Sequence, residues 1–193
     1  MRKATAEVLG REFDRETLVA NVGQPLPRQM ELLAPEKAGE LLEAYGIYNE
    51  ELHEGLIREF PNVQTSLARL RDAGLQRAVV TSKRRFSVER ALDSFPALRE
   101  VIDVFVTMED TTEHKPLPAP LLKGLELLGN ISPERAAYVG DATFDIDAAR
   151  AAGVMSIAVS WGAGTDEALR AAGPDHLFAD LDSAVDFLLG AKD

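Results

Sequence analysis

A change of sequence pattern at Pro61 is the feature that most constrains the fold of this chain. Residues 1–60 show helical patterns and no alternation of the kind that predicts a β-strand. After Pro61, short apolar runs alternate with helical stretches of roughly ten residues, which is typical of βαβ units and a parallel sheet. We therefore predict an α/β protein with helices on both faces of its sheet, divided into a helical segment (residues 1–60) and an α/β core (residues 61–193).

The same patterns place the individual elements. In the helical segment we expect helices at 4–9 and 15–20, a break at 23–27 that includes Pro25 and Pro27, and a long amphipathic helix that starts at Pro35. In the core the predicted strands are 77–81, 104–107, 136–139, 156–159 and 176–178. The predicted helices between and after them are 63–73, 87–95, 120–128, 144–152, 165–172 and 183–189.

Composition excludes several classes of function. The net charge is −11 and both parts of the chain are acidic, so no basic patch favours nucleic acid or an anionic membrane as a partner. The chain has no cysteine, which excludes disulfides and thiolate chemistry, and its three histidines are scattered. No apolar run approaches the length that spans a bilayer. We expect a cytoplasmic protein, and the sequence carries no indication of its oligomeric state.

Polar residues follow three of the apolar runs or lie on the loops after them. Thr81 and Ser82 follow the run at 78–80, Lys115 lies in a proline-rich loop, and Asp141 and Asp145 follow the run at 136–139. Each has an ordinary alternative, namely a capping Thr/Ser pair, a solvated lysine, and a helix N-cap with a first-turn acid. Because parallel sheets bind ligands at the carboxyl ends of their strands, these groups together predict one site. A hydroxyl, a cation and an acid pair suited to Mg²⁺ are the parts that phosphoryl transfer requires.

These residues also carry a family resemblance. Val80-Thr81-Ser82-Lys83, then Lys115-Pro116-Leu117-Pro118-Ala119-Pro120, then Gly140-Asp141 with Asp145, resemble motifs two, three and four of the haloacid dehalogenase-like hydrolase superfamily. The similarity is greatest to the branch of the phosphoglycolate phosphatases, which includes bacterial inorganic pyrophosphatases. The resemblance implies that the helical segment is an α-helical cap, with residues 21–25 as the loop that closes over the substrate.

The resemblance also implies a role for each matching residue. Thr81 would hydrogen-bond the phosphoryl group, with Ser82 as a weaker candidate, and Lys115 would neutralise charge on the nucleophile and the phosphate. Asp141 would bind Mg²⁺, and Asp145 would be a second acid that binds or orients the metal and its waters. The implied activity is Mg²⁺-dependent hydrolysis of a small phosphorylated metabolite, such as phosphoglycolate or pyrophosphate, through an aspartyl-phosphate.

The chain departs from the family pattern at one place. Family members begin with an apolar strand that ends in Asp-x-Asp-Gly-Thr, which supplies the nucleophile and lies in the sheet between the strands ending here at Thr81 and Gly140. This sequence contains no such segment, and Asp14, Asp110 and Asp147 are poor substitutes. We therefore expect Met1 to be an internal start of a longer native protein.

The sequence is also compatible with functions other than that of a phosphatase. One is a truncated or non-catalytic relative without hydrolase activity in this form. A phosphorelay receiver domain also combines acids, a hydroxyl and a lysine, but its acid pair comes first and its lysine last. A dinucleotide-binding domain would need Gly-x-Gly-x-x-Gly after its first strand, and Gly162-Ala163-Gly164 comes late and lacks the third glycine.

Overall fold

The computed structural model describes residues 1–190, so the last three residues of the predicted core lie outside the described part. The helical segment contains α1 (Arg2–Leu9), α2 (Arg15–Val19), α3 (Leu26–Leu33), the 3₁₀ turn η1 (Pro35–Lys37) and α4 (Ala38–Leu56). The strands of the core are β1 (Ala78–Val80), β2 (Val104–Val106), β3 (Ala137–Gly140), β4 (Met155–Val159) and β5 (His176–Phe178). Its helices are α5 (Val63–Asp72), α6 (Arg85–Ser94), α7 (Leu98–Val101), α8 (Ala119–Leu127), α9 (Thr143–Ala152), α10 (Asp166–Ala172) and α11 (Leu181–Gly190), with 3₁₀ turns η2 (Met108–Asp110) and η3 (Pro133–Arg135).

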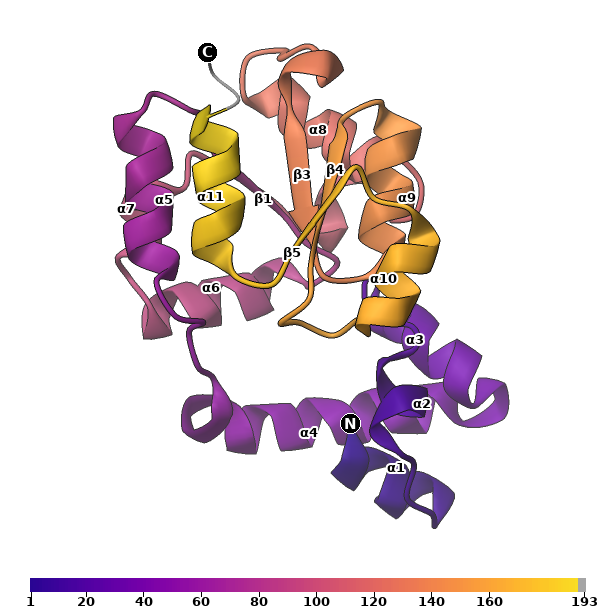
Figure 1. Ribbon diagram of the computed structural model, residues 1–193. Coiled ribbons are helices and arrows are strands. Elements are labelled where there is room, and N and C mark those ends of the chain that lie inside the picture. The colour runs from indigo at the N-terminus through magenta and orange to yellow at the C-terminus, as the bar shows by residue number, and fades with distance from the viewer. Residues whose placement is uncertain (191–193) are drawn as a thin grey trace.

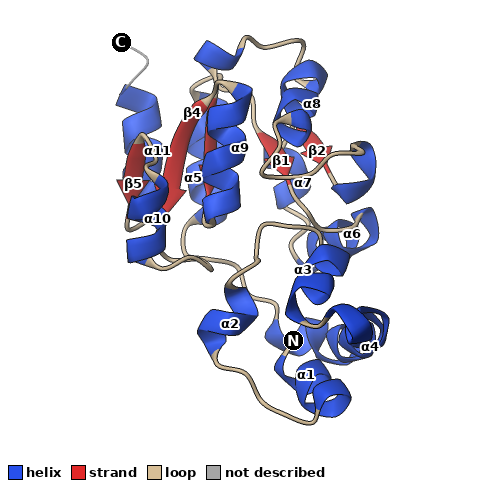
Figure 2. Cartoon of the chain, turned by 90° about the vertical axis from the view of Figure 1, so that its right-hand side faces the viewer, coloured by secondary structure: helices blue, strands red, loops and turns tan. Residues whose placement is uncertain are grey.

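The strands confirm the predicted α/β fold, because every paired strand runs parallel to its neighbour. β1 pairs with β2, with Ala78 opposite Val104, and β3, β4 and β5 form a second sheet in that order, with Tyr138 opposite Ser156. Within residues 1–190 no strand pairs with the second edge of β1 or of β3. Figure 2 shows these two groups of strands standing apart, β1 and β2 on one side and β3 to β5 on the other.

Helices cover both faces of the strands. In the two ribbon views, α8 and α9 lie on one face, while α5 and α11 lie on the other (Figures 1 and 2). The main core cluster joins α8 to α9 through Leu121, Ala148 and Ala149, which are 4% exposed or less. A second cluster joins α9 to β4 and α10 through Ile146, Ala158 and Leu169. Small alanine side chains on α9 allow this helix to approach the strands closely.

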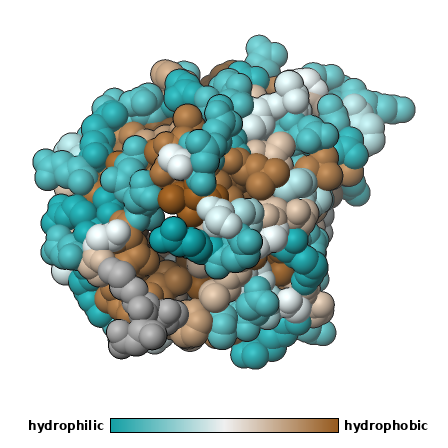
Figure 3. Space-filling model, turned by 90° about the horizontal axis from the view of Figure 1, so that it is seen from above, coloured by the Kyte–Doolittle hydropathy of each residue, from teal (hydrophilic) through white to brown (hydrophobic). Residues whose placement is uncertain are grey.

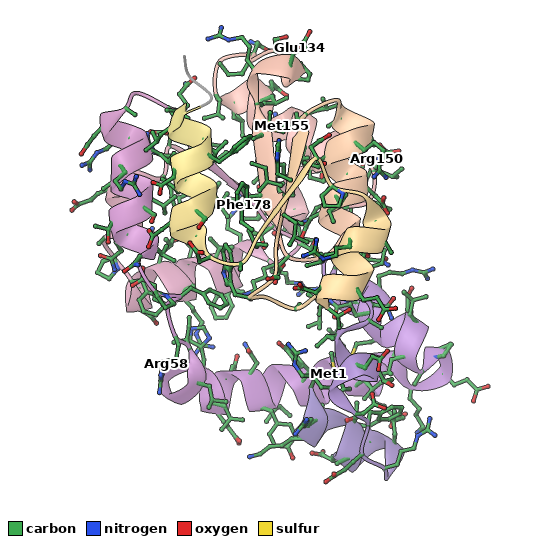
Figure 4. The ribbon with its side chains drawn as sticks, in the orientation of Figure 1. Met1, Arg58, Glu134, Arg150, Met155 and Phe178 are labelled. Atoms are coloured by element: carbon green, nitrogen blue, oxygen red, sulfur yellow. The ribbon has the colours of Figure 1, made fainter. Side chains whose placement is uncertain are left out.

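The helical segment forms its own packed layer below the core (Figure 1). Its α1 and α3 pack on the long α4, and the fully buried side chains of these helices include Ala4, Thr5, Met30 and Leu41. Met1 and Arg58, labelled in Figure 4, mark this layer, whereas Met155 and Phe178 lie in the core above it. No helix within residues 1–190 is long and apolar enough to cross a membrane.

Hydrogen bonds between Asp175, which precedes β5, and Ser156 on β4 should make the stability of the protein depend on pH. Asp175 accepts hydrogen bonds from the backbone N–H and the hydroxyl of Ser156, both at 2.7 Å. These bonds hold the pKa of Asp175 below its usual value, the backbone bond contributing most. A lowered pKa stabilises the fold above pH ~4 and this contribution is lost as the pH falls through the folded-state pKa. We expect Asp175→Asn to destabilise the protein at pH 7 and this deficit to shrink as the pH falls toward 3, as measured by urea unfolding; an equal deficit at both pH values would contradict the assignment.

Candidate active site

Thr81 lies directly after β1, and its hydroxyl proton has no hydrogen-bond acceptor among residues 1–190. Its backbone N–H extends the sheet by donating to the Val106 carbonyl at 2.9 Å. Its Oγ1 accepts a hydrogen bond from the backbone N–H of Lys83 at 3.2 Å. Because this bond uses a lone pair of the oxygen, the hydroxyl proton remains available for an anion at the end of the strand.

Lys115 and Asp145 form a buried ion pair. The distance from Lys115 Nζ to Asp145 Oδ1 is 2.6 Å, and the two side chains are 7% and 6% exposed. The second carboxylate oxygen, Asp145 Oδ2, accepts a hydrogen bond from the backbone N–H of Ala142 at 3.1 Å. The structure therefore brings together two residues that are 30 positions apart in the sequence, and it gives both oxygens of Asp145 a protein partner.

Tyr138 completes this network, and the sequence patterns did not identify it. Its hydroxyl lies 3.0 Å from Lys115 Nζ and 2.9 Å from the Val80 carbonyl oxygen. Burial raises the pKa of Tyr138 to about 12. Burial alone lowers the pKa of Lys115, but Tyr138 and Asp145 beside it outweigh that effect, so its pKa is raised and the ammonium stays charged. The only sequence signal for Tyr138 is a single hydroxyl in an otherwise apolar strand.

Asp141 stands at the carboxyl end of β3 and holds the loop that follows β4. Its Oδ2 accepts a hydrogen bond from the backbone N–H of Ala163 at 2.8 Å, and its carbonyl accepts one from Gly164 at 2.8 Å. Its other carboxylate oxygen, Oδ1, makes no hydrogen bond to any residue between 1 and 190. The side chain is therefore anchored by one oxygen and presents the other.

This arrangement fits Mg²⁺ at Asp141 better than at Asp145. Mg²⁺ in proteins is commonly held by one or two carboxylates, with waters and substrate phosphate as the remaining ligands, and the free Oδ1 of Asp141 matches that pattern. The oxygens of Asp145 already interact with Lys115 and Ala142, which suits a residue that orients the site. Within the described part of the chain there is no group of three or more His, Cys, Asp or Glu residues that could hold a metal.

Two glycines allow these acids to come close to their neighbours. A Cβ atom on Gly140 would overlap with the Cβ and Cγ of Asp145, and a Cβ on Gly162 would overlap with the side chain of Asp141. The overlapping atoms include the Cβ of each aspartate, which cannot rotate away from its backbone. Gly140 therefore allows the end of β3 to lie close to Asp145, and Gly162 allows the loop after β4 to lie close to Asp141.

We expect Gly140→Ala to destabilise the protein by about 1–3 kcal/mol, since β3 and α9 must move apart to admit the methyl group. Gly46→Ala is the matched control, because Gly46 lies inside α4 and a Cβ there would meet nothing within 4 Å. That control should stabilise the protein by about 0.5–1 kcal/mol through helix propensity. Chemical unfolding of both variants measures the difference, and two effects of the same sign would contradict the packing argument.

The loop at Gly23 brings the helical segment onto the site. Gly23 has φ +107°, and a Cβ there would lie 3.1 Å from the Cβ of Phe144 and 3.2 Å from that of Ala142, at the start of α9. Ser82 donates its hydroxyl hydrogen bond to the Gly23 carbonyl. In this structure Ser82 therefore holds the loop of the helical segment beside the end of β1.

A cavity of about 430 Å³ opens between the helical segment and the core, next to Lys115. Most of its lining is apolar, with charge supplied by Arg28, Glu31 and Lys115. Arg28 and Glu31 pair with each other at 3.0 Å and are both more than half exposed. Its lining residues are Gln24, Pro25, Pro27, Arg28 and Glu31 from the helical segment, and Met108, His114, Lys115, Pro116 and Leu117 from the core.

The three other aspartates considered as nucleophiles have local partners. Asp14 caps α2 by accepting from the backbone N–H of Thr17 at 2.7 Å. Asp110 accepts from Thr107 at 2.7 and 2.8 Å and pairs with Arg85. Asp147 is exposed and pairs with Arg150 at 3.0 Å. None of the three belongs to the network around Lys115.

A family model and the similar curated proteins agree on the family of this chain. A family model described as haloacid dehalogenase-like hydrolase matches residues 1–159. A provisionally named pyrophosphatase PpaX of Caldanaerobacter subterraneus subsp. tengcongensis is 41% identical over 174 residues, which is 90% of this chain and 78% of that protein. Pyrophosphatase PpaX of Bacillus cereus is 34% identical over 177 residues, or 92% of this chain and 80% of that protein.

Solved structures agree with these relatives. A provisionally assigned phosphoglycolate phosphatase from Lactobacillus plantarum superimposes with a TM-score of 0.80 at 25% identity, covering 96% of this chain and 89% of that chain. A haloacid dehalogenase-like hydrolase from Bacteroides fragilis, also provisionally assigned, gives a TM-score of 0.84 at 23% identity, covering 95% and 88%. The second likeness concerns the fold alone.

Proposed function

Because the chain belongs to the haloacid dehalogenase-like hydrolases, we propose that it functions in a Mg²⁺-dependent phosphohydrolase. This enzyme would act on a small phosphorylated metabolite through an aspartyl-phosphate. The observation that carries this proposal is the buried pair of Lys115 and Asp145 at the strand ends that present Thr81 and Asp141. A charged lysine, a hydroxyl donor and a free carboxylate oxygen, held close together, match the charge distribution of a phosphoryl group.

The chain's own residues divide the work of binding. Thr81 donates its hydroxyl proton to a phosphoryl oxygen, and Lys115 supplies a fixed positive charge beside it. Asp145 holds Lys115 in place, and Asp141 would hold Mg²⁺ through Oδ1, which has no hydrogen-bond partner among residues 1–190. When bound, Mg²⁺ neutralises charge on the phosphoryl oxygens.

We propose that the nucleophile arrives on an apolar strand lying between β1 and β3. Support comes from the edges of these two strands, which no strand within residues 1–190 pairs, and from the hydrogen bond of the Tyr138 hydroxyl on β3 to the Val80 carbonyl on β1, which links the two strands. Val139, in the middle of β3, is 36% exposed, although such positions are normally covered in a parallel sheet. From above, apolar surface fills a hollow between hydrophilic rims (Figure 3).

An aspartate at the carboxyl end of that strand would stand between Thr81 and Asp141. Its carboxylate oxygen would form a bond to phosphorus while the bond from phosphorus to the leaving-group oxygen breaks. Water would then bond to the phosphorus of the aspartyl-phosphate, which breaks its bond to the carboxylate oxygen and releases phosphate. Without such a strand, we expect the residues 1–193 to bind phosphate and not to hydrolyse its esters.

We further propose that the helical segment acts as a cap and that the cavity beside Lys115 receives the leaving group. The loop at Gly23 rests on the start of α9, which supports closure over the site. A cavity of this size suits a small metabolite, in keeping with the pyrophosphatases and phosphoglycolate phosphatase named among the similar proteins. A panel of phosphoglycolate, pyrophosphate, sugar phosphates and nucleotides would identify the substrate.

Binding of inorganic phosphate in the presence of Mg²⁺ tests the proposal on this chain. We expect Thr81→Val to weaken phosphate binding about tenfold by calorimetry, since a hydrogen bond to a charged group is lost. Thr111→Val is the matched control, because the Thr111 hydroxyl donates to the Glu113 carbonyl in a loop outside the network. Absence of phosphate binding by the wild-type chain, or equal affinities of the two variants, would refute the assignment.

A further inference from the structure

The hydroxyl of Tyr138 lies where three parts of the candidate site meet. It contacts Lys115 Nζ in the loop before α8, the Val80 carbonyl at the end of β1, and, at 3.4 Å, Asp145 Oδ1 in the first turn of α9. Tyr138 itself belongs to β3. One oxygen atom therefore links both groups of strands and the two charged residues of the site.

The hydrogen bonds fix the orientation of this hydroxyl. A tyrosine hydroxyl has one proton, and the Val80 carbonyl at 2.9 Å is a closer acceptor than Asp145 Oδ1 at 3.4 Å. With the proton given to Val80, the oxygen offers its lone pairs to Lys115, whose ammonium has only protons to donate. Both groups are thus satisfied in one arrangement.

Counting hydrogen bonds in the same way shows that one N–H of the Lys115 ammonium is left over. Its ammonium carries three N–H bonds, of which one points to Asp145 Oδ1 and one to the Tyr138 oxygen. The third has no hydrogen-bond partner among residues 1–190. The ammonium rotates about its Cε–Nζ bond, and two hydrogen bonds oppose that rotation more strongly than the bond to Asp145 alone, so the third N–H keeps a set direction.

We propose that Tyr138 is a positioning residue, whose hydroxyl aims the third N–H of Lys115 at the bound phosphoryl group and ties the end of β1, with Thr81, to the same point. The proposal rests on the proposed function for the target of that N–H. It assigns no chemical step to Tyr138, which acts through Lys115 and the Val80 backbone.

The test compares Tyr138→Phe with Tyr48→Phe. The Tyr48 hydroxyl donates to Glu7 in the helical segment at 2.6 Å, so its loss is a matched control that leaves the core untouched. We expect Tyr138→Phe to weaken Mg²⁺-dependent phosphate binding about 3- to 10-fold, and to broaden and shift the NMR signal of the Lys115 ammonium, while Tyr48→Phe changes neither. Wild-type affinity together with an unchanged Lys115 signal in Tyr138→Phe would overturn the proposal.

The wild-type spectrum provides a second test that needs no variant. We expect a slowly exchanging Tyr138 hydroxyl proton with a nuclear Overhauser effect to the Lys115 ammonium; a hydroxyl that exchanges freely would overturn the proposal even if Tyr138→Phe fails to fold. If the wild-type chain binds no phosphate, the proposed function fails. The Lys115 and Tyr138 signals still decide whether the tyrosine fixes the ammonium.

Discussion

Replacing Lys115 with methionine is expected to lower the free energy of unfolding by about 3–5 kcal/mol, because it leaves the buried carboxylate of Asp145 without its cation. Both side chains of the pair are less than a tenth exposed, so water cannot take over the role of the ammonium. The Tyr138 oxygen loses its hydrogen-bond donor in the same step. Methionine fills a similar volume, so the effect reports the charge and its hydrogen bonds more than the loss of packing.

Two further variants isolate this effect. Lys123→Met removes a lysine of the same core that pairs with Glu126 at 2.9 Å on an exposed face of α8, and it should change stability by less than about 0.5 kcal/mol. The double variant Lys115→Met/Asp145→Leu should recover part of the loss, since it removes the unpaired buried charge but also takes the acceptor from the Ala142 N–H. A loss below about 1 kcal/mol for Lys115→Met in urea unfolding would contradict the buried-pair description.

Asp141→Asn is expected to reduce Mg²⁺-dependent turnover at least about 100-fold once the nucleophile strand is supplied, in line with the loss of one charge-stabilising group from an active site. Asparagine keeps an oxygen that can accept from Ala163, so the loop after β4 should stay in place and the fold should survive. What is lost is the negative charge and the second oxygen, which are the features that suit a hard cation.

Asp147→Asn serves as the control for this second prediction. Asp147 is exposed, lies on the same helix as Asp145 and pairs only with Arg150 among the residues described. Calorimetric titration with Mg²⁺ and a phosphate-release assay should separate the two variants. Comparable Mg²⁺ affinity in Asp141→Asn and Asp147→Asn would show that Asp141 is not a ligand.

The sequence predicted the strands well because their signal is local. Each apolar run in the core, such as 136–139, became a strand whose ends differ by one residue or so from the prediction. In contrast, α3 was missed, since Pro25 and Pro27 were interpreted as a break. Proline is tolerated in the first turn of a helix, where its missing N–H has no partner to lose, and Pro27 is the second residue of α3.

The sequence patterns proposed the residues of the candidate site but not the contacts among them. Spacing placed Thr81 and Asp141 at strand ends and Lys115 in a loop, but it could not show that Asp145 is bound by Lys115, because that contact spans 30 residues. The contact of Ser82 with Gly23 spans 59 residues and depends on how the helical segment packs on the core. Tyr138 has no spacing signal, since a tyrosine in an apolar strand is ordinarily a core residue.

The measurement that tests the central claim most directly is phosphate release from pyrophosphate or phosphoglycolate, with Mg²⁺, by two proteins. One is the chain of residues 1–193, and the other carries before Met1 an apolar strand that ends in Asp-x-Asp-Gly-Thr. The account predicts turnover only for the second protein, and loss of that turnover when the first aspartate of the added strand is replaced by asparagine. Equal turnover by both proteins would contradict it, because the described residues would then contain their own nucleophile.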